Sequence, residues 1–158
     1  MVVSISDIRV APIGEDLTTD ELSLSVLRGI ESMHRVDKKV AVGETFLRGE
    51  WAVLNVDGKA ERPGGTGVGG TYLVWSGTDR FDSRATGQVT LIMSHPVIAE
   101  SSRYDTGFNY NVGDYLTVKD VGPGTAFVTA WATGDAKLAR VVAVNSGSLV
   151  FETLGGVE

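Results

Sequence analysis

The sequence has no cysteine and only two histidines among its 158 residues. Without cysteine, the chain lacks a disulfide framework, a thiolate metal site and a cysteine nucleophile. Two histidines also leave little material for a histidine-rich metal centre. We therefore expect a protein with no metal and no cofactor.

Long apolar runs and an excess of positive charge are also missing. Apolar runs such as residues 91–93 and 141–144 fall far short of the roughly 20 residues that a membrane helix needs. The N-terminus lacks the basic start and continuous apolar core of a signal peptide. A net charge of −6 argues against a protein that coats nucleic acid. We expect a protein made in a cytoplasm, with neither membrane nor direct nucleic-acid contact.

Residues with β-branched side chains are abundant. The 22 valines, 14 threonines and 6 isoleucines make up 42 of the 158 residues. These side chains are stiff at χ1 and fit a pleated, half-buried surface, so they favour sheet over helix. A hydrophobic content of 42% is ordinary for a chain that builds a core. The composition predicts an all-β fold.

Residues 1–39 are predicted to form a separate N-terminal segment. Apolar and polar residues alternate over residues 1–13, which end near Pro12 and predict an extended arm or edge strand. Thr18 and Glu21 form a capping box that predicts one short helix over residues 18–35. The apolar residues of its expected face are Leu22, Val26, Ile30 and Met33. Leu22, Leu24 and Val26 also alternate, which leaves a strand as the alternative.

Residues 40–158 are predicted to form a small β-barrel or sandwich, or two small β modules. Turn signals such as Asp57-Gly58 and Asn145-Ser146-Gly147 separate short apolar runs, with no helix pattern between them. The expected strands are residues 40–46, 51–56, 71–75, 88–93, 115–119, 125–132, 137–144 and 148–154. Strands at this spacing are typical of small barrels and sandwiches.

A glycine-rich stretch at residues 65–70 fits the pattern G-x-G-x-x-G. Dinucleotide binding needs a strand before this motif and a helix after it, whereas a strand-like run follows here. Five of the seven residues 64–70 are glycine, which costs much backbone entropy to order. We expect a surface loop that is mobile unless a partner holds it.

The tripeptide Asp105-Thr106-Gly107 matches the catalytic motif of aspartic proteases. That chemistry needs two aspartates that share one proton at the end of an apolar strand, whereas residues 100–104 are polar and charged. A solvated turn is the simpler interpretation. A small β-barrel protease that uses Asp105 stays open as the alternative of a different class.

Other candidate groups favour structural roles. His34 and His95 have no G-x-S-x-G elbow to accompany them, so surface or hydrogen-bonded roles are expected. The scattered aspartates lack the spacing of a calcium-binding loop and predict turns. Trp51, Trp75 and Trp131 lie within β-like runs and are expected in the core.

The order of segments in residues 44–154 resembles that of small structural proteins of tailed bacteriophages, in particular capsid decoration (cement) proteins. The segments are residues 49–55, 57–60, 72–75, 78–83, 85–90, 110–118 and 139–142. Among them, Gly113-Asp114-Tyr115-Leu116-Thr117-Val118 matches a Gly-Asp-x-Leu-x-Val strand that such proteins follow with a turn and a late strand closing a small barrel. The resemblance covers about two thirds of the chain.

This resemblance implies a structural protein of the virion, and the family has no catalytic residues to carry over. The expected partners are the major capsid protein and neighbouring copies of the chain, on the outer capsid surface. The residues expected to contact the shell are Val3, Ile5, Ile8 and Val10 of the arm and Gly65, Gly67 and Gly69 of the loop. A tail-tube or neck protein is the alternative within the structural class.

Overall fold

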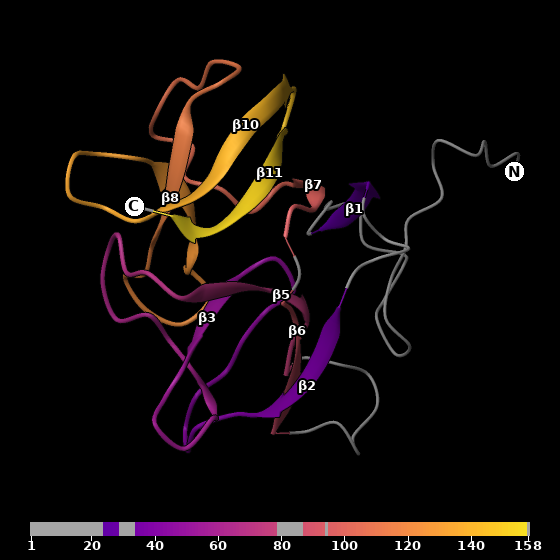
Figure 1. Cartoon of the computed structure of the whole chain (residues 1–158), viewed down its shortest axis with the longest axis vertical. Coiled ribbons are helices and arrows are strands. Elements are labelled where there is room, and N and C mark those ends of the chain that lie inside the picture. The colour runs from indigo at the N-terminus through magenta and orange to yellow at the C-terminus, as the bar shows by residue number, and fades with distance from the viewer. Residues whose placement is uncertain (1–23, 29–33, 79–86, 94, 158) are drawn as a thin grey trace, which may run out of the picture.

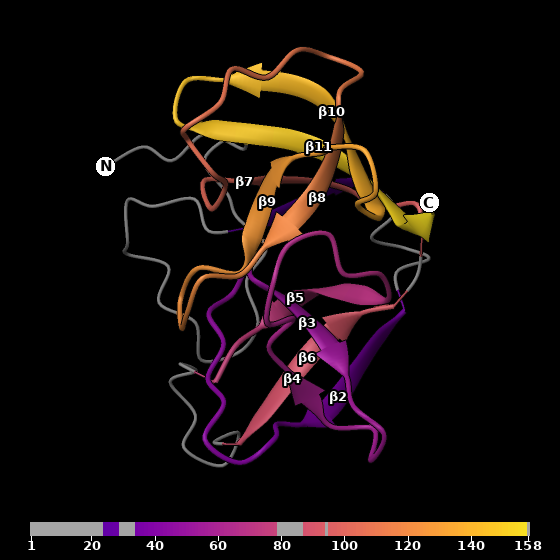
Figure 2. The same ribbon diagram turned by 90° about the vertical axis from the view of Figure 1, so that its left-hand side faces the viewer.

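The residues that the structure describes form eleven β-strands, which are arranged in two antiparallel sheets (Figure 1). This computed structural model describes residues 24–28, 34–78, 87–93 and 95–157. The two sheets occupy separate halves of the molecule and face each other as the layers of a small β-sandwich (Figure 2). The prediction of an all-β fold is confirmed.

Six strands form the first sheet, in the order β1-β7-β11-β10-β8-β9. Their bounds are β1 Ser25–Arg28, β7 Ile98–Ser101, β8 Tyr115–Lys119, β9 Phe127–Ala130, β10 Lys137–Asn145 and β11 Ser148–Val157. The hairpin of β10 and β11 turns where the sequence predicts, but the turn is the two residues Ser146-Gly147, because Asn145 belongs to β10 and lies opposite Ser148.

Five strands form the second sheet, in the order β2-β6-β5-β3-β4. Their bounds are β2 Arg35–Lys39, β3 Trp51–Leu54, β4 Ala60–Glu61, β5 Thr71–Ser76 and β6 Gln88–Ile92. Its two edges approach each other, because Val40 bridges Ala60 and the Ala41 N–H donates to the Ala60 carbonyl at 2.8 Å. This sheet therefore curls toward a small barrel.

The helix predicted over residues 18–35 is wrong where the structure describes that segment. Ser25–Arg28 form β1, which pairs with β7, and Arg35 begins β2. Leu24 and Val26 alternate into the core, as the strand alternative required, and pairing with β7 satisfies the backbone groups of β1. The described parts of residues 1–39 thus belong to the two sheets. The predicted arm lies outside the described residues.

The strand predicted over residues 40–46 is also wrong beyond Val40. Residues 41–43 form a turn, in which the Glu44 N–H donates to the Ala41 carbonyl at 3.0 Å. After this turn the chain enters the core with Phe46, which is only 1% exposed.

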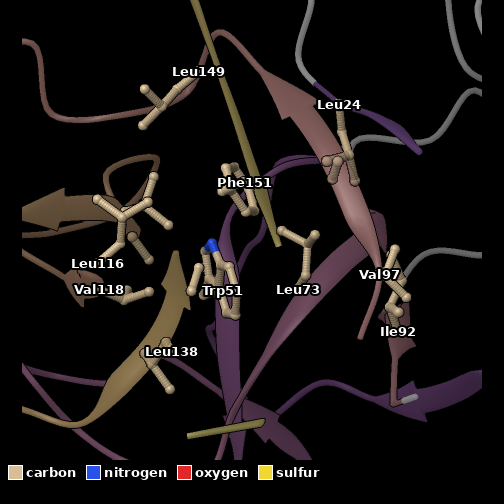
Figure 3. Packing of buried hydrophobic residues seen from close by; sticks show 14 of the residues in the cluster. Leu24, Trp51, Leu73, Ile92, Val97, Leu116, Val118, Leu138, Leu149 and Phe151 are labelled. Atoms are coloured by element: carbon tan, nitrogen blue, oxygen red, sulfur yellow. The ribbon is translucent and has the colours of Figure 1, made fainter. Parts of the chain in front are cut away.

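The main core lies between the two sheets (Figure 3). Trp51 of β3 approaches Phe151 of β11, with ring centroids 6.2 Å apart. Trp51 and Trp75 are almost fully buried, which confirms their predicted core positions. A second cluster lies on the other face of the five-stranded sheet and consists of Phe46, Ala52, Ala60, Val74, Val89 and Leu91.

A buried ion cluster joins the loops of the two sheets. The Arg62 guanidinium, which follows β4, contacts Glu50 at 3.0 Å and Asp120 at 2.8 Å. The Glu50 carboxylate is 0% exposed and also accepts the N–H groups of Leu47 and Ala126. Its negative charge is therefore fully satisfied, which a buried carboxylate requires. The cluster fixes the loop before β3 against the loop after β8.

Candidate contact surfaces

The shell-contact residues predicted from the sequence fall into two groups. Val3, Ile5, Ile8 and Val10 lie outside the described residues. Gly65, Gly67 and Gly69 lie in the described segment between β4 and β5.

The glycine-rich segment at residues 64–70 is held on both sides, which corrects the prediction of a mobile loop. The Gly64 N–H donates to the Asp120 carboxylate at 2.9 Å, and the Asp120 N–H donates to the Gly65 carbonyl at 2.9 Å. The Gly67 N–H donates to Val118, and the Ala136 N–H donates to the Gly67 carbonyl at 3.0 Å. These hydrogen bonds offset the entropy cost that glycine imposes, because their acceptors and donors already belong to the six-stranded sheet and its loops.

The three glycines predicted to contact a shell differ in what surrounds them. Gly67 has a φ of +77°, and a Cβ there would lie 2.6 Å from the Asp135 Cγ. Gly67 is therefore needed for packing. A Cβ at Gly65 would meet nothing within 4 Å, and one at Gly69 would only touch Ala136 at 3.7 Å. Gly65 and Gly69 are the positions where a partner has room.

The surroundings of this segment do not form a phosphate-binding loop. β5 begins at Thr71, directly after Gly70, so a strand follows the glycines. The motif therefore lacks the helix N-terminus that faces a pyrophosphate in dinucleotide-binding proteins.

Asp105 stabilises a turn. Its carboxylate accepts the Gly107 N–H at 3.0 Å and the Thr129 hydroxyl at 2.8 Å. The Gly107 hydrogen bond lowers the pKa of Asp105, and this effect, with help from Thr129 and Lys119, outweighs the opposing effect of burial. An aspartic-protease pair needs a proton held between two carboxylates, which requires a raised pKa on one of them. The geometry at Asp105 is that of an ionised turn residue.

A shallow cleft of about 170 Å³ lies beside Asp105. Its lining residues are Asp105, Lys119, Val121, Thr125 and Phe127. Pockets for small ligands usually measure roughly 300–1,000 Å³, so this cleft is small for a cofactor.

The histidines occupy different surroundings. His34 is exposed at the start of β2. His95 is partly buried, and its Nδ1 lies 3.0 Å from the Thr153 hydroxyl, which itself accepts the Val97 N–H. Burial lowers the pKa of His95, which favours the neutral form of the ring.

The described residues contain no group of three or more histidine, aspartate or glutamate side chains placed to hold a metal ion. They also contain no helix that is long and apolar enough to cross a membrane.

Four side chains that sequence reasoning did not bring together meet on the surface of the six-stranded sheet. Tyr115 and Trp131 form an edge-to-face pair, with ring centroids 6.2 Å apart. The Lys137 ammonium lies 4.3 Å from the Tyr115 centroid and 4.9 Å from the Trp131 centroid. The Arg140 guanidinium lies 5.9 Å from the Tyr115 centroid. We call these four residues the β8–β10 face.

This face corrects the prediction that Trp131 belongs to the core. Trp131 is half-buried, and Tyr115 is 39% exposed. The signal was present in the alternation of β8, because Leu116 and Val118 point into the core and place Tyr115 on the opposite side.

Comparison with known proteins found no matching family model, no matching curated protein and no matching solved structure.

Proposed function

We propose that this chain is a structural protein of a tailed bacteriophage that binds the outer surface of the capsid and stabilises the shell. The observation that carries the proposal is the position of β8. This strand contains Leu116 to Val118 of the Gly-Asp-x-Leu-x-Val sequence that resembles decoration proteins, and Gly113 and Asp114 directly precede its first residue, Tyr115. It lies between β9 and β10 in the six-stranded sheet. The late strand β10 pairs with it, with Ala139 opposite Leu116, and β11 follows β10 in the sheet. Along the chain, β9 comes between β8 and this late strand, and in the sheet β10 is an inner strand.

The net negative charge of the chain supports a location on the outer surface of a capsid. The interior of a capsid holds densely packed DNA, which repels a protein with a net charge of −6. The outer surface faces solvent and protein, where this charge favours solubility.

Stabilisation of a shell does not require a strong single contact. A protein that binds only the assembled shell stabilises it by mass action, and many copies bridging neighbouring subunits add through avidity. The expected partners are the major capsid protein and neighbouring copies of the chain. An extended arm at residues 1–13 suits this role, because an arm can add a strand to an exposed sheet edge.

The test is co-sedimentation of the purified protein with phage shells that lack it. The wild-type protein is expected to sediment with the shells, and the major capsid protein is expected to co-purify with it. Gly65→Ser and Gly69→Ser probe the second predicted contact, because both positions have room for a side chain and the fold should persist. A protein that stays in the supernatant at every concentration contradicts the proposal.

A tail-tube or neck role gives a different result in the same preparation. Tail-tube proteins assemble into rings, so electron microscopy of the protein alone or with tails would show stacked rings instead of decorated shells.

A further inference from the structure

The β8–β10 face carries two cations, Lys137 and Arg140. Neither of them lies within 4 Å of a carboxylate oxygen among the described residues. The cations contact aromatic rings instead, which leaves their charge available to a further partner.

Three acidic side chains lie around this face, but none of them forms an ion pair with Lys137 or Arg140. Asp114 and Asp135 direct a carboxylate oxygen to their own turns, where they accept the N–H groups of Asn111 and Ala132. Glu152 lies opposite Arg140 in the register of β10 and β11 and reduces the net charge of the face, but it forms no ion pair with Arg140.

Hydrogen bonds also hold Trp131 and Arg140 of the β8–β10 face in one arrangement. The Trp131 indole N–H donates to the Asp135 carbonyl at 2.7 Å, and the Trp131 backbone N–H donates to Tyr115 at 3.2 Å. The Arg140 Nε donates to the Gly113 carbonyl at 3.3 Å. Figure 1 shows β8 and β10, the strands that carry Tyr115, Lys137 and Arg140, side by side in one sheet. Rigid aromatic residues beside an arginine are the groups that most often dominate protein–protein binding, because little conformational entropy is lost on contact.

We propose that the β8–β10 face docks a carboxylate-bearing segment of the shell protein. A polyanion such as nucleic acid does not fit, because two cations neutralise few phosphates and the whole chain is acidic. A single carboxylate can pair with the Lys137 ammonium or the Arg140 guanidinium, which form no ion pair among the described residues, and apolar atoms next to it can contact the exposed part of Tyr115. This inference rests on the proposed function, because it takes the shell protein as the partner.

The test compares Arg140→Glu with a matched control on the other sheet. Arg140 is exposed, so reversing its charge should leave the fold intact, which circular dichroism can check. We expect Arg140→Glu to weaken binding to purified shells by about tenfold or more. The control changes Lys39 of β2 to Glu, which alters the net charge equally, and should bind within about twofold of wild type.

Zero-length carbodiimide coupling supplies a second measurement. It joins a lysine ammonium to a carboxylate in contact with it, so Lys137 should become linked to an acidic residue of the shell protein. Lys137→Arg retains the charge and the ring contacts, so it should bind like wild type and lose this cross-link.

The outcomes separate the two proposals. If the wild-type protein does not bind shells, both the proposed function and the proposed docking role of the β8–β10 face are overturned. If the wild-type protein binds and Arg140→Glu binds equally well, the docking face alone is overturned. Equal weakening by Arg140→Glu and Lys39→Glu also overturns it, because only the overall charge would then matter.

Discussion

Gly67 occupies a position that excludes any side chain. Its φ of +77° lies in the left-handed region, and the Asp135 carboxylate fills the space where a Cβ would stand. Asp135 cannot easily withdraw, because it also accepts the Ala132 N–H at 3.2 Å. The tight approach lets the Gly67 backbone bond to both β8 and Ala136.

We expect Gly67→Ala to destabilise the protein. The backbone conformation alone costs a non-glycine residue about 1–3 kcal/mol, and the overlap with Asp135 adds to this. Gly65→Ala is the matched control and should change the free energy of unfolding by less than about 0.5 kcal/mol. Urea unfolding of the two variants measures the difference, and equal stabilities would show that Gly67 has no special role.

Because His95 is partly buried, we expect the free energy of unfolding of the protein to depend on pH. Burial lowers its pKa in the folded protein below the unfolded value of about 6.5. The unfolded chain therefore binds the proton more tightly, so stability falls as pH decreases through about 6.5 and levels off below the folded pKa.

His95→Gln should remove this dependence, because glutamine does not titrate. The measurement is the urea midpoint of wild type and variant between about pH 7 and pH 5. A variant that keeps the slope of the wild type would assign the pH dependence to another group.

Sequence reasoning at the residue scale succeeded where local pattern decides. Trp51 and Trp75 lie in apolar runs and are buried, as predicted. Gly65 and Gly67 were predicted to lie in a mobile loop, because nothing local reveals that Val118, Asp120 and Ala136 hold them. These partners lie more than 50 residues away in sequence, beyond the reach of turn chemistry.

The contact between the loop before β3 and the loop after β8 depends on the buried cluster of Glu50, Arg62 and Asp120. Burial opposes ionisation of Asp120, but the Arg62 guanidinium and the Gly64 and Gly122 N–H groups outweigh it and hold its pKa below the usual value. The lowered pKa keeps Asp120 in its anionic form beside the Arg62 guanidinium. The cluster also orders the glycine segment, because Asp120 accepts the Gly64 N–H.

We expect Glu50→Gln to lower the free energy of unfolding by about 3 kcal/mol. The amide cannot accept hydrogen bonds at both ends, so either Leu47 or Ala126 loses its acceptor and Arg62 loses one counter-charge. Glu44→Gln, on a partly exposed side chain in the same loop, should cost less than about 0.5 kcal/mol. Equal values for both variants in urea unfolding would refute the role of the cluster.

At the scale of elements, strands bounded by clear turns could be predicted, and strands defined by distant partners could not. β5, β8, β10 and β11 follow local alternation or apolar runs between turn residues. β1 has a helix-compatible sequence and is a strand because β7 pairs with it. Residues 41–46 have strand-like composition, but the turn at 41–43 prevents a strand there.

For the whole molecule, the proposed function includes a shell contact made by residues 1–13, which the sequence predicts to form an extended arm. Deletion of residues 2–12 should preserve the circular dichroism spectrum and reduce binding to shells by about a hundredfold, because one of several contacts would be lost. A sedimentation assay measures the binding. Unchanged binding would remove Val3, Ile5, Ile8 and Val10 from the contact surface.

The most direct test of the whole account is electron cryo-microscopy of shells prepared with and without this protein. Shells with the protein should show additional density at regular positions on the outer surface, of a size that fits the two-sheet body. Identical outer surfaces in the two preparations, or density confined to the tail or neck, would contradict the proposal that this chain decorates the capsid.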